Sequence, residues 1–175
     1  FGILHNVEVI NRFVRTELDL IGKEEMPENY LRRMTPMQAR MVLSRLELVD
    51  HNSAIRIKYA KMYHEGLSDL PGIILPPLRT DGSHVYSYYP VQYKDRDKLV
   101  YWLALKCRDV GVQHLKNCAD LPAFEDFYSD CPNTRATAVE VILLPTYPDY
   151  LESNVKEHIR VIRQFFDQNP VVESA

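Results

Sequence analysis

A capped helix start followed by a long apolar stripe is the feature that most constrains this chain. Thr35 can accept hydrogen bonds from the first-turn amides, Pro36 suits the first helical position, and Gln38 completes a capping box. Apolar side chains then recur at helical spacing: Met37, Met41, Leu46, Val49, Ile55, Tyr59, Ala60, Tyr63 and Leu67. At about 1.5 Å per residue, such a helix runs for roughly 45 Å, longer than a core of this size covers. We expect a break near His51-Asn52-Ser53, and contacts between part of the helix and something outside this chain.

Composition narrows the class of protein. The 175 residues, 46% of them hydrophobic, supply enough apolar material for one sizeable core. A formal net charge of −3 removes the usual electrostatic basis for tight binding to nucleic acid or to an anionic membrane. No apolar run approaches the roughly 20 residues that a membrane-spanning helix needs. We therefore expect neither partner. Because the chain opens at Phe1 without a methionine, we also expect a piece of a longer polypeptide.

The cysteines and histidines do not form a recognisable metal or disulfide pattern. Cys107, Cys118 and Cys131 are odd in number, and their spacing fits neither a disulfide framework nor a zinc knuckle. No two of the six histidines lie four residues apart on one helix. We expect reduced thiols in a cytoplasmic protein and no metal site.

Downstream of the long helix, the period of the pattern changes. Alternation from Val85 to Tyr93 predicts a strand with one aromatic face, and Pro90 indicates an edge position or a bulge. Asp95 is the expected cap of a helix that ends at Gly111 in the left-handed conformation. The side chains expected to face inward from this helix are Leu99, Trp102, Leu103, Leu105 and Cys107.

The remaining elements complete the fold class. An amphipathic helix is expected at 7–21, a short second strand at 112–115, a helical turn at 123–128, and a buried apolar segment at 139–144. A final helix carries an apolar stripe formed by Val155, Ile159, Ile162 and Phe166, with Phe165 beside it. This order predicts an α+β fold, in which a small, mostly antiparallel sheet is covered on one face by helices behind a long lead-in helix.

Standard catalytic motifs are absent, and three polar groups remain as candidates. There is no Gly-x-Gly-x-x-Gly, no Walker lysine, no Gly-x-Ser-x-Gly and no His-Glu-x-x-His. The run 29–33 precedes a helix start and either holds an anion or is a solvated loop with two surface arginines. His84, Tyr86 and Tyr88 either line a ligand pocket or belong to the core. His114, Lys116 and Asn117 either point into the same cleft or lie on the surface.

A set of short motifs, in order and spacing, carries a family resemblance. These motifs are Arg33-Met34-Thr35-Pro36-Met37-Gln38-Ala39, Tyr59-Ala60-Lys61-Met62-Tyr63, Leu70-Pro71-Gly72-Ile73, His84-Val85-Tyr86-Ser87-Tyr88-Tyr89, Arg96-Asp97-Lys98-Leu99, Gly111-Val112 and Leu143-Leu144-Pro145-Thr146-Tyr147-Pro148. Residues 29–167 resemble the C-terminal half of the DegT/DnrJ/EryC1/StrS aminotransferases, which are pyridoxal-phosphate enzymes acting on nucleotide-linked sugars.

The resemblance implies a domain organisation and a missing part. Residues 1–34 correspond to the lead-in from a large domain, and residues 35–175 to the C-terminal small domain of fold-type I pyridoxal-phosphate (PLP) transferases. In the family, the Schiff-base lysine belongs to the large domain, which would precede Phe1. The resemblance therefore implies a parent protein that binds pyridoxal 5'-phosphate, forms a homodimer and acts on a nucleotide-linked keto sugar. This chain alone is expected to bind no cofactor covalently and to have no catalytic residue.

The family pattern also suggests which residues approach the cofactor and substrate. Asn29 and Arg33 are the candidates for contacting the cofactor phosphate, because they flank Leu31, which stands where the family has an asparagine that reaches the neighbouring subunit's phosphate. Tyr88, His114 and Asn117 are the candidates for the substrate cleft.

Three departures from the family pattern keep a second interpretation open. Leu31 offers no donor to a phosphate, Ser87 stands where a histidine is common, and Asn117-Cys118-Ala119 replaces His-Tyr-Pro. The alternative is a degenerate, non-catalytic module for dimerisation or for binding a sugar nucleotide.

Overall fold

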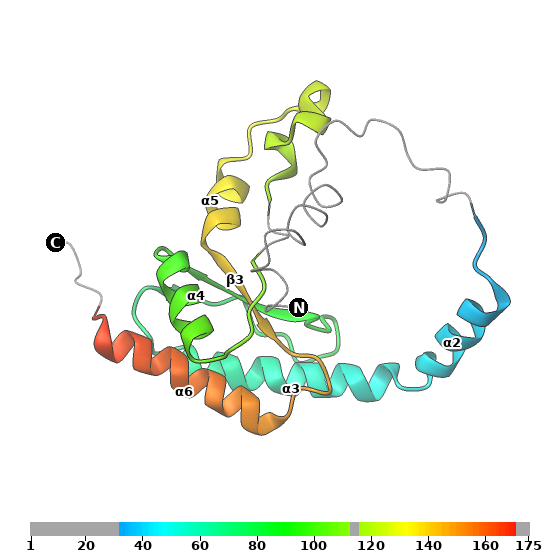
Figure 1. The fold of residues 1–175 in the computed structure, drawn as a ribbon, viewed down its shortest axis with the longest axis horizontal. Helices are drawn as coiled ribbons and strands as arrows, with labels where there is room; N and C mark the ends of the chain where they lie inside the picture. The colour runs from blue at the N-terminus through cyan, green and yellow to red at the C-terminus, as the bar shows by residue number, and fades with distance from the viewer. Residues whose placement is uncertain (1–31, 113–115, 171–175) are drawn as a thin grey trace.

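The structure, a computed structural model, describes residues 32–112 and 116–170 (Figure 1). The elements in chain order are α2 (Pro36–Leu46), α3 (Val49–Leu67), β1 (Ile73–Ile74), β2 (Tyr88–Tyr93), α4 (Arg96–Leu105), the 3-10 helices η3 (Cys118–Asp120) and η4 (Pro122–Phe127), α5 (Pro132–Glu140), β3 (Val141–Pro145) and α6 (Glu152–Gln168). The predicted α+β class is confirmed. The predicted helix at 7–21 lies outside the described residues.

The expected long helix is two helices joined by a short break. The capping box at the start of α2 is confirmed, since the Thr35 hydroxyl accepts from the Gln38 amide and the Gln38 side chain accepts from the Thr35 amide. The break lies at 47–48 and not at 51–53, where it was predicted. The amide of Asn52 donates to the carbonyl of Leu48 at 2.9 Å, so the backbone of 51–53 is already inside α3.

Three antiparallel strands form the sheet in the order β1-β2-β3. Pro90 therefore lies on the central strand, and the expectation of an edge position is wrong. Its partner on β3, Leu143, uses both its amide and its carbonyl in hydrogen bonds with Gly111, on the far side of β3. The ladder between β2 and β3 therefore needs no amide hydrogen at position 90. On the other side, β1 pairs only with 92–93, so Pro90 lies beyond its end.

The core lies between one face of the sheet and three helices. In Figure 1, α3 and α6 run side by side below the sheet, with α4 above α6. Tyr86 and Tyr150 join this core from loops, and its other buried side chains come from α3, β2, α4, β3 and α6: Tyr59, Ala60, Tyr63, Leu67, Tyr89, Val91, Tyr93, Leu99, Leu103, Ile142, Leu144, Val155, Val161, Ile162, Phe165 and Phe166. The indole of Trp102 donates to the carbonyl of Val161 at 3.1 Å and fixes α4 against α6.

Helix α4 begins where predicted and ends earlier. Asp95 occupies the cap position, but its side chain makes no capping hydrogen bond. Leu105 and Cys107 are exposed, so their predicted inward orientation is wrong. Cys107 takes the left-handed conformation with φ of 54°, which was predicted for Gly111. Gly111 instead pairs with β3, where an added Cβ would lie 3.4 Å from the Leu143 side chain.

The segment after 116 contains one element that the pattern did not predict. The helical turn expected at 123–128 corresponds to η4. Helix α5, which begins at a proline in its first turn, was missed, and Val139 lies exposed on it and not in a buried segment. The predicted strand at 112–115 can be followed only at its start, because 113–115 lie outside the described residues.

Helix α2 stands apart from the rest of the described fold (Figure 1). None of its residues is buried, in contrast to α3, which contributes four side chains to the core. No helix among the residues described here is long and apolar enough to cross a membrane.

Candidate cofactor and substrate site

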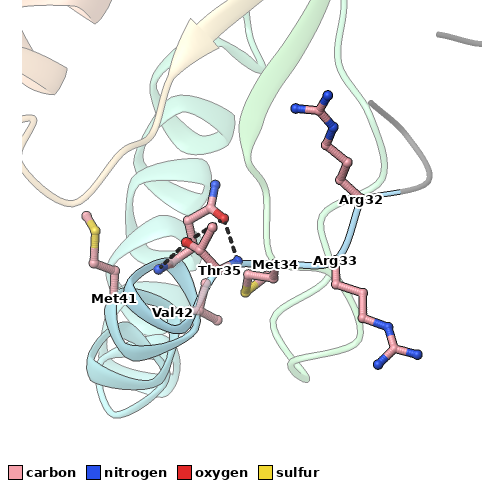
Figure 2. A pocket seen from close by; sticks show the side chains of 7 residues that line it. Arg32, Arg33, Met34, Thr35, Met41 and Val42 are labelled. Atoms are coloured by element: carbon pink, nitrogen blue, oxygen red, sulfur yellow. Dashed lines mark hydrogen bonds between the residues drawn. The ribbon is translucent and has the colours of Figure 1, made fainter. Parts of the chain in front are cut away.

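The loop before α2 and the start of that helix form an open hollow. Its lining consists of Arg32, Arg33, Met34, Thr35, Gln38, Met41 and Val42. Arg33 is exposed and forms no hydrogen bond or ion pair with any residue the structure describes. Figure 2 shows the guanidinium groups of Arg32 and Arg33 pointing away from each other. The capping box joins Thr35 to Gln38 at the start of the helix. The hollow thus offers two separate cations and no converging anion site.

Two of the predicted site residues cannot be placed. Asn29, a candidate cofactor contact, and His114, a candidate substrate contact, both lie outside the described residues. Their roles stay predictions.

Tyr88 is accessible at the start of β2. Its side chain is 49% exposed, and its backbone pairs with Pro145 at the end of β3. The neighbouring Tyr89 lies on the opposite face, fully buried, where its hydroxyl is 2.9 Å from Nδ1 of His64. Tyr88 therefore lies on the face of the sheet away from the core, and its role as a substrate contact stays a prediction.

Tyr86, by contrast, belongs to the core. It is 1% exposed, and its hydroxyl accepts a hydrogen bond from the Arg79 amide at 2.6 Å. The predicted common face of His84, Tyr86 and Tyr88 is interrupted because Tyr86 adopts φ of 48°. The imidazole of His84 instead stacks on the Tyr86 ring at 4.1 Å. Of the two open interpretations of this group, the core one holds for Tyr86.

A buried hydroxyl holds this unusual backbone, and the sequence analysis did not single it out. Thr146 is fully buried, and its hydroxyl lies 2.6 Å from the carbonyl of Tyr86 and 3.0 Å from that of Ser87. Arg56 of α3 also donates to the Ser87 carbonyl, at 2.9 Å. A threonine between two prolines in an apolar run, where packing alone would favour an aliphatic side chain, was the available signal.

Asn117 lies at the start of η3 and is 8% exposed. Its side-chain oxygen accepts from the Ala119 amide, and its nitrogen donates to a carboxylate oxygen of Asp120 at 2.9 Å. Arg135 of α5 holds the same carboxylate with two hydrogen bonds, at 2.7 and 2.8 Å. The contact with Arg135, followed by that with Asn117, lowers the pKa of Asp120. Asn117 thus has a structural role in capping a turn.

The described structure does not join the candidate residues into one site. No hydrogen bond or ion pair within the described ranges links Arg33 to Tyr88 or to Asn117. Figure 1 places α2 and the η3–η4 region at separate ends of the fold. Within the described ranges, these three residues therefore do not form one site.

The lysines and the potential metal ligands of the described ranges limit the chemistry that this part of the chain can support. All seven lysines within the described ranges are exposed, and the one whose pKa is clearly shifted, Lys58, has it raised by the hydrogen bond to Glu152 at 2.6 Å. A Schiff-base lysine needs a neutral amine, which burial or a neighbouring cation favours. Among the residues that the structure covers, no group of three or more potential metal ligands converges.

Comparison with known proteins identifies relatives along most of the chain. A transaminase of Aneurinibacillus thermoaerophilus, dTDP-3-amino-3,6-dideoxy-alpha-D-galactopyranose transaminase, is 25% identical over 138 residues, which are 76% of this chain and 37% of the relative. An uncharacterised protein of Methanocaldococcus jannaschii is 24% identical over 149 residues, covering 80% of this chain and 39% of that protein. The chain therefore spans well under half the length of the curated relatives it matches.

Solved structures share the fold. DesV of S. venezuelae, in complex with a ketimine intermediate, superposes with a TM-score of 0.72 at 23% identity, covering 94% of this chain and 46% of its own. NtdA of Bacillus subtilis, with bound cofactor PMP, gives a TM-score of 0.68 at 21% identity, covering 78% of this chain and 33% of its own. The family profile described as the DegT/DnrJ/EryC1/StrS aminotransferase family matches residues 15–163. The chain belongs to the DegT/DnrJ/EryC1/StrS aminotransferase family.

Proposed function

We propose that this chain is the C-terminal part of a PLP-dependent aminotransferase-like protein that acts on a nucleotide-linked keto sugar, and that it is not catalytic on its own. The main support for the proposal is that the structural match covers nearly all of this chain but less than half of the matched protein. The fold of DesV accounts for 94% of this chain, but this chain accounts for 46% of DesV. The name of the Aneurinibacillus relative, a transaminase of a dTDP-linked amino sugar, supports the substrate class.

The described residues fit one part of the cofactor and not another. A guanidinium such as that of Arg33 can bind a phosphate through charge-assisted hydrogen bonds. The exposed lysines do not fit the covalent attachment, because an ammonium group in water is protonated and is a poor nucleophile. Asn29 is proposed as a second phosphate contact.

The proposed substrate contacts are Tyr88, His114 and Asn117. Tyr88 offers an exposed aromatic ring and hydroxyl at the end of β2. Asn117 can offer its amide to a ligand only if its turn with Asp120 rearranges, because both ends of the amide are already hydrogen-bonded. Since Arg33 and these residues lie apart in one chain, the proposed parent protein is a homodimer in which the cleft combines two subunits.

A cofactor titration tests the proposal. Pyridoxal phosphate added to the longer polypeptide that contains this chain should produce an internal-aldimine absorbance that borohydride abolishes, because reduction of the imine leaves the cofactor attached through a secondary amine. The 175-residue chain alone should produce none. Arg33→Ala should weaken cofactor binding in the longer polypeptide, and Arg32→Ala is the matched control. An aldimine on the short chain, or the absence of any lysine-bearing domain upstream of Phe1, would overturn the proposal.

A non-catalytic module is the second candidate, favoured by the engagement of Asn117 in a structural turn. It predicts that the short chain binds a nucleotide sugar by itself. Calorimetric titration with a panel of dTDP- and UDP-linked sugars separates the two candidates. Negligible heat with the short chain supports a half-site, and saturable binding supports the module.

A further inference from the structure

The loop between β1 and β2 contains the one Asp-Gly pair of the sequence, Asp81-Gly82. An aspartate followed by glycine closes a succinimide ring more readily than other pairs, because glycine places no side chain beside its own amide nitrogen. Gly82 has a φ of 81°, and a Cβ built on it would meet no atom within 4 Å. Asp81, Gly82 and Ser83 are all exposed. The pair is therefore open to water, and no packed group opposes a movement of the glycine.

A buried tyrosine closes the loop that carries this pair. The hydroxyl of Tyr86 accepts a hydrogen bond from the amide of Arg79 at 2.6 Å, and the amide of Tyr86 donates to Nδ1 of His84 at 2.9 Å. The residues between the two anchors, 80–85, are all exposed. A change of backbone length at 81–82 therefore falls in a segment that supplies no core side chain, and we expect the fold to survive it.

Ser83 holds the carboxylate of Asp81. Its hydroxyl and its amide donate to Oδ1, at 2.6 and 3.0 Å. These two contacts, the hydroxyl first, lower the pKa of the Asp81 carboxyl, and the charge of Arg79 acts in the same direction. Closure of the ring needs the neutral carboxylic acid, because the oxygen that leaves departs as water. The Ser83 contacts therefore slow a reaction that the exposed, unobstructed backbone favours.

We infer that Asp81 is a site of spontaneous conversion to isoaspartate, at a rate that Ser83 sets. The Gly82 nitrogen attacks Cγ of the protonated Asp81 side chain. An N–Cγ bond forms, the nitrogen loses its proton, and one carboxyl oxygen leaves as water. Water then opens the succinimide. Breaking the original bond from the nitrogen to the main-chain carbonyl carbon of Asp81 gives isoaspartate, and breaking the new N–Cγ bond returns aspartate. The steps need no oxidant, and the mass is unchanged overall.

The product is a modified backbone that a second enzyme class can read. In isoaspartate the main chain passes through Cγ and is one carbon longer, and the former main-chain carbonyl becomes a free carboxylate. Carboxyl methyltransferases that use S-adenosylmethionine take this carboxylate as substrate. The exposed loop at 80–85 leaves residue 81 accessible to such an enzyme. The inference goes beyond the proposed function and does not rest on it.

Ageing followed by peptide mapping tests the site. A sample kept for weeks at physiological temperature should contain a second form of the peptide that spans 81–82, with the same mass and a different elution. This form should resist an aspartate-specific endoprotease at residue 81 and should accept one methyl group from S-adenosylmethionine through an isoaspartate-specific methyltransferase.

Three variants test the chemistry. Ser83→Ala removes the shorter hydrogen bond to the carboxylate and should raise the rate at least about twofold. Gly82→Ala should lower the rate several-fold, because the added methyl group hinders the attack and disfavours positive φ. Asp81→Glu should abolish the second form, because its ring would need six members. Circular dichroism should show that all three variants are folded.

Two controls separate this site from general ageing. Asn52-Ser53 is another pair that forms imides readily, but it lies inside α3, where the Asn52 amide donates to the carbonyl of Leu48 at 2.9 Å. It should stay intact in the folded chain and react in concentrated urea. Ser129→Ala removes an exposed serine from a different loop and should leave the rate at Asp81 unchanged.

Two results would overturn the inference. A peptide spanning 81–82 that stays a single, fully cleavable form after ageing, while Asn52 reacts in urea, means that Asp81 is not a site of isomerisation. A rate in Ser83→Ala that does not exceed the rate of the parent sequence means that Ser83 does not control it. Both readouts follow the loop alone, so the proposed aminotransferase function stands or falls separately.

Discussion

The hydroxyl of Thr146 lies 2.6 Å from the carbonyl oxygen of Tyr86, a residue sixty positions away whose φ is 48°. A tyrosine in this left-handed region is sterically unfavourable and persists only where the surroundings hold it. Thr146 is fully buried and also faces the Ser87 carbonyl. The contact therefore fixes the backbone that leads into Tyr88, the exposed residue of the proposed substrate cleft.

Replacing this hydroxyl should destabilise the fold. Thr146→Val keeps the volume and leaves the Tyr86 carbonyl without its donor, which should cost about 1–3 kcal/mol in the free energy of unfolding. Thr146→Ser keeps the donor and should cost less. Urea denaturation measures both. Equal losses for the two variants would assign the effect to the methyl group and not to the hydrogen bond.

A buried histidine should make stability fall on mild acidification. His158 of α6 is fully buried; Nδ1 lies 3.1 Å from the Tyr150 hydroxyl, and Nε2 has no hydrogen-bond partner. Burial, with a smaller contribution from Arg108, lowers the pKa of His158 to about 4.

Because the unfolded chain binds the proton more readily, stability is highest above the unfolded pKa of 6.5 and falls as the pH drops from there toward 4. The loss should be of the order of 3 kcal/mol, since each pKa unit corresponds to about 1.4 kcal/mol. His158→Phe should flatten this part of the curve, measured by urea denaturation at several pH values. His51, exposed on α3, offers the control variant His51→Phe, which should leave the slope unchanged.

An ion pair between α6 and the residues just after α3 should stabilise the fold until the pH falls well below the range in which His158 acts. Arg163 binds Asp69 through two hydrogen bonds of 2.6 and 2.7 Å, and this pairing lowers the pKa of Asp69 to about 2. A depressed carboxyl pKa stabilises the fold above the unfolded value of 3.8, and the contribution is lost as the pH falls through about 2. Carboxyl NMR titration should show the low pKa. In Arg163→Met, a pKa that stays near 2 would contradict this cause.

Gly66 should be required by the close approach of α3 to α6. An added Cβ would lie 2.7 Å from Cγ2 of Ile159. Alanine is intrinsically better than glycine in a helix by about 1 kcal/mol, but overpacking typically costs about 1–3 kcal/mol. Gly66→Ala should therefore give no net gain in stability. In an Ile159→Ala background, where the obstructing methyl group is gone, the same change should stabilise, and additive effects in the double-mutant cycle would refute the clash.

Elements with a strong local signal were predictable from the sequence. The Thr35–Gln38 capping box and the apolar stripe of α6 depend on neighbours three or four residues away, and both are present as expected. The end of α4 was wrong because a cysteine takes the left-handed position that glycine ordinarily occupies. Helix α5 was missed because its residues contribute no buried side chain, so it has no apolar period to detect.

The candidate site was less predictable, for a different physical reason. Whether Tyr86 or Tyr88 faces a ligand depends on the left-handed turn at Tyr86, and the Thr146 side chain that holds it comes from a distant part of the sequence. Asn117 caps its turn through local contacts with Ala119 and Asp120, and Asp120 is held in turn by Arg135 from α5, an element that the pattern did not show. Arg33 was named from its motif, and no described residue of this chain forms a hydrogen bond or ion pair with it.

The loop before α2 and the helix itself (residues 32–49, the α2 arm) carry three exposed methionines, whose oxidation can report whether this surface is covered. Met34, Met37 and Met41 are exposed thioethers, whereas Met62 of α3 is packed against the core. Peroxide converts accessible methionine to the sulfoxide, a mass change that peptide mapping assigns residue by residue. In separated chains, the three arm methionines should oxidise well ahead of Met62. An assembly that shields the arm, with a second copy or with further domains, should lower the oxidation rate of these three methionines relative to that of Met62. The measurement needs no label and no substitution.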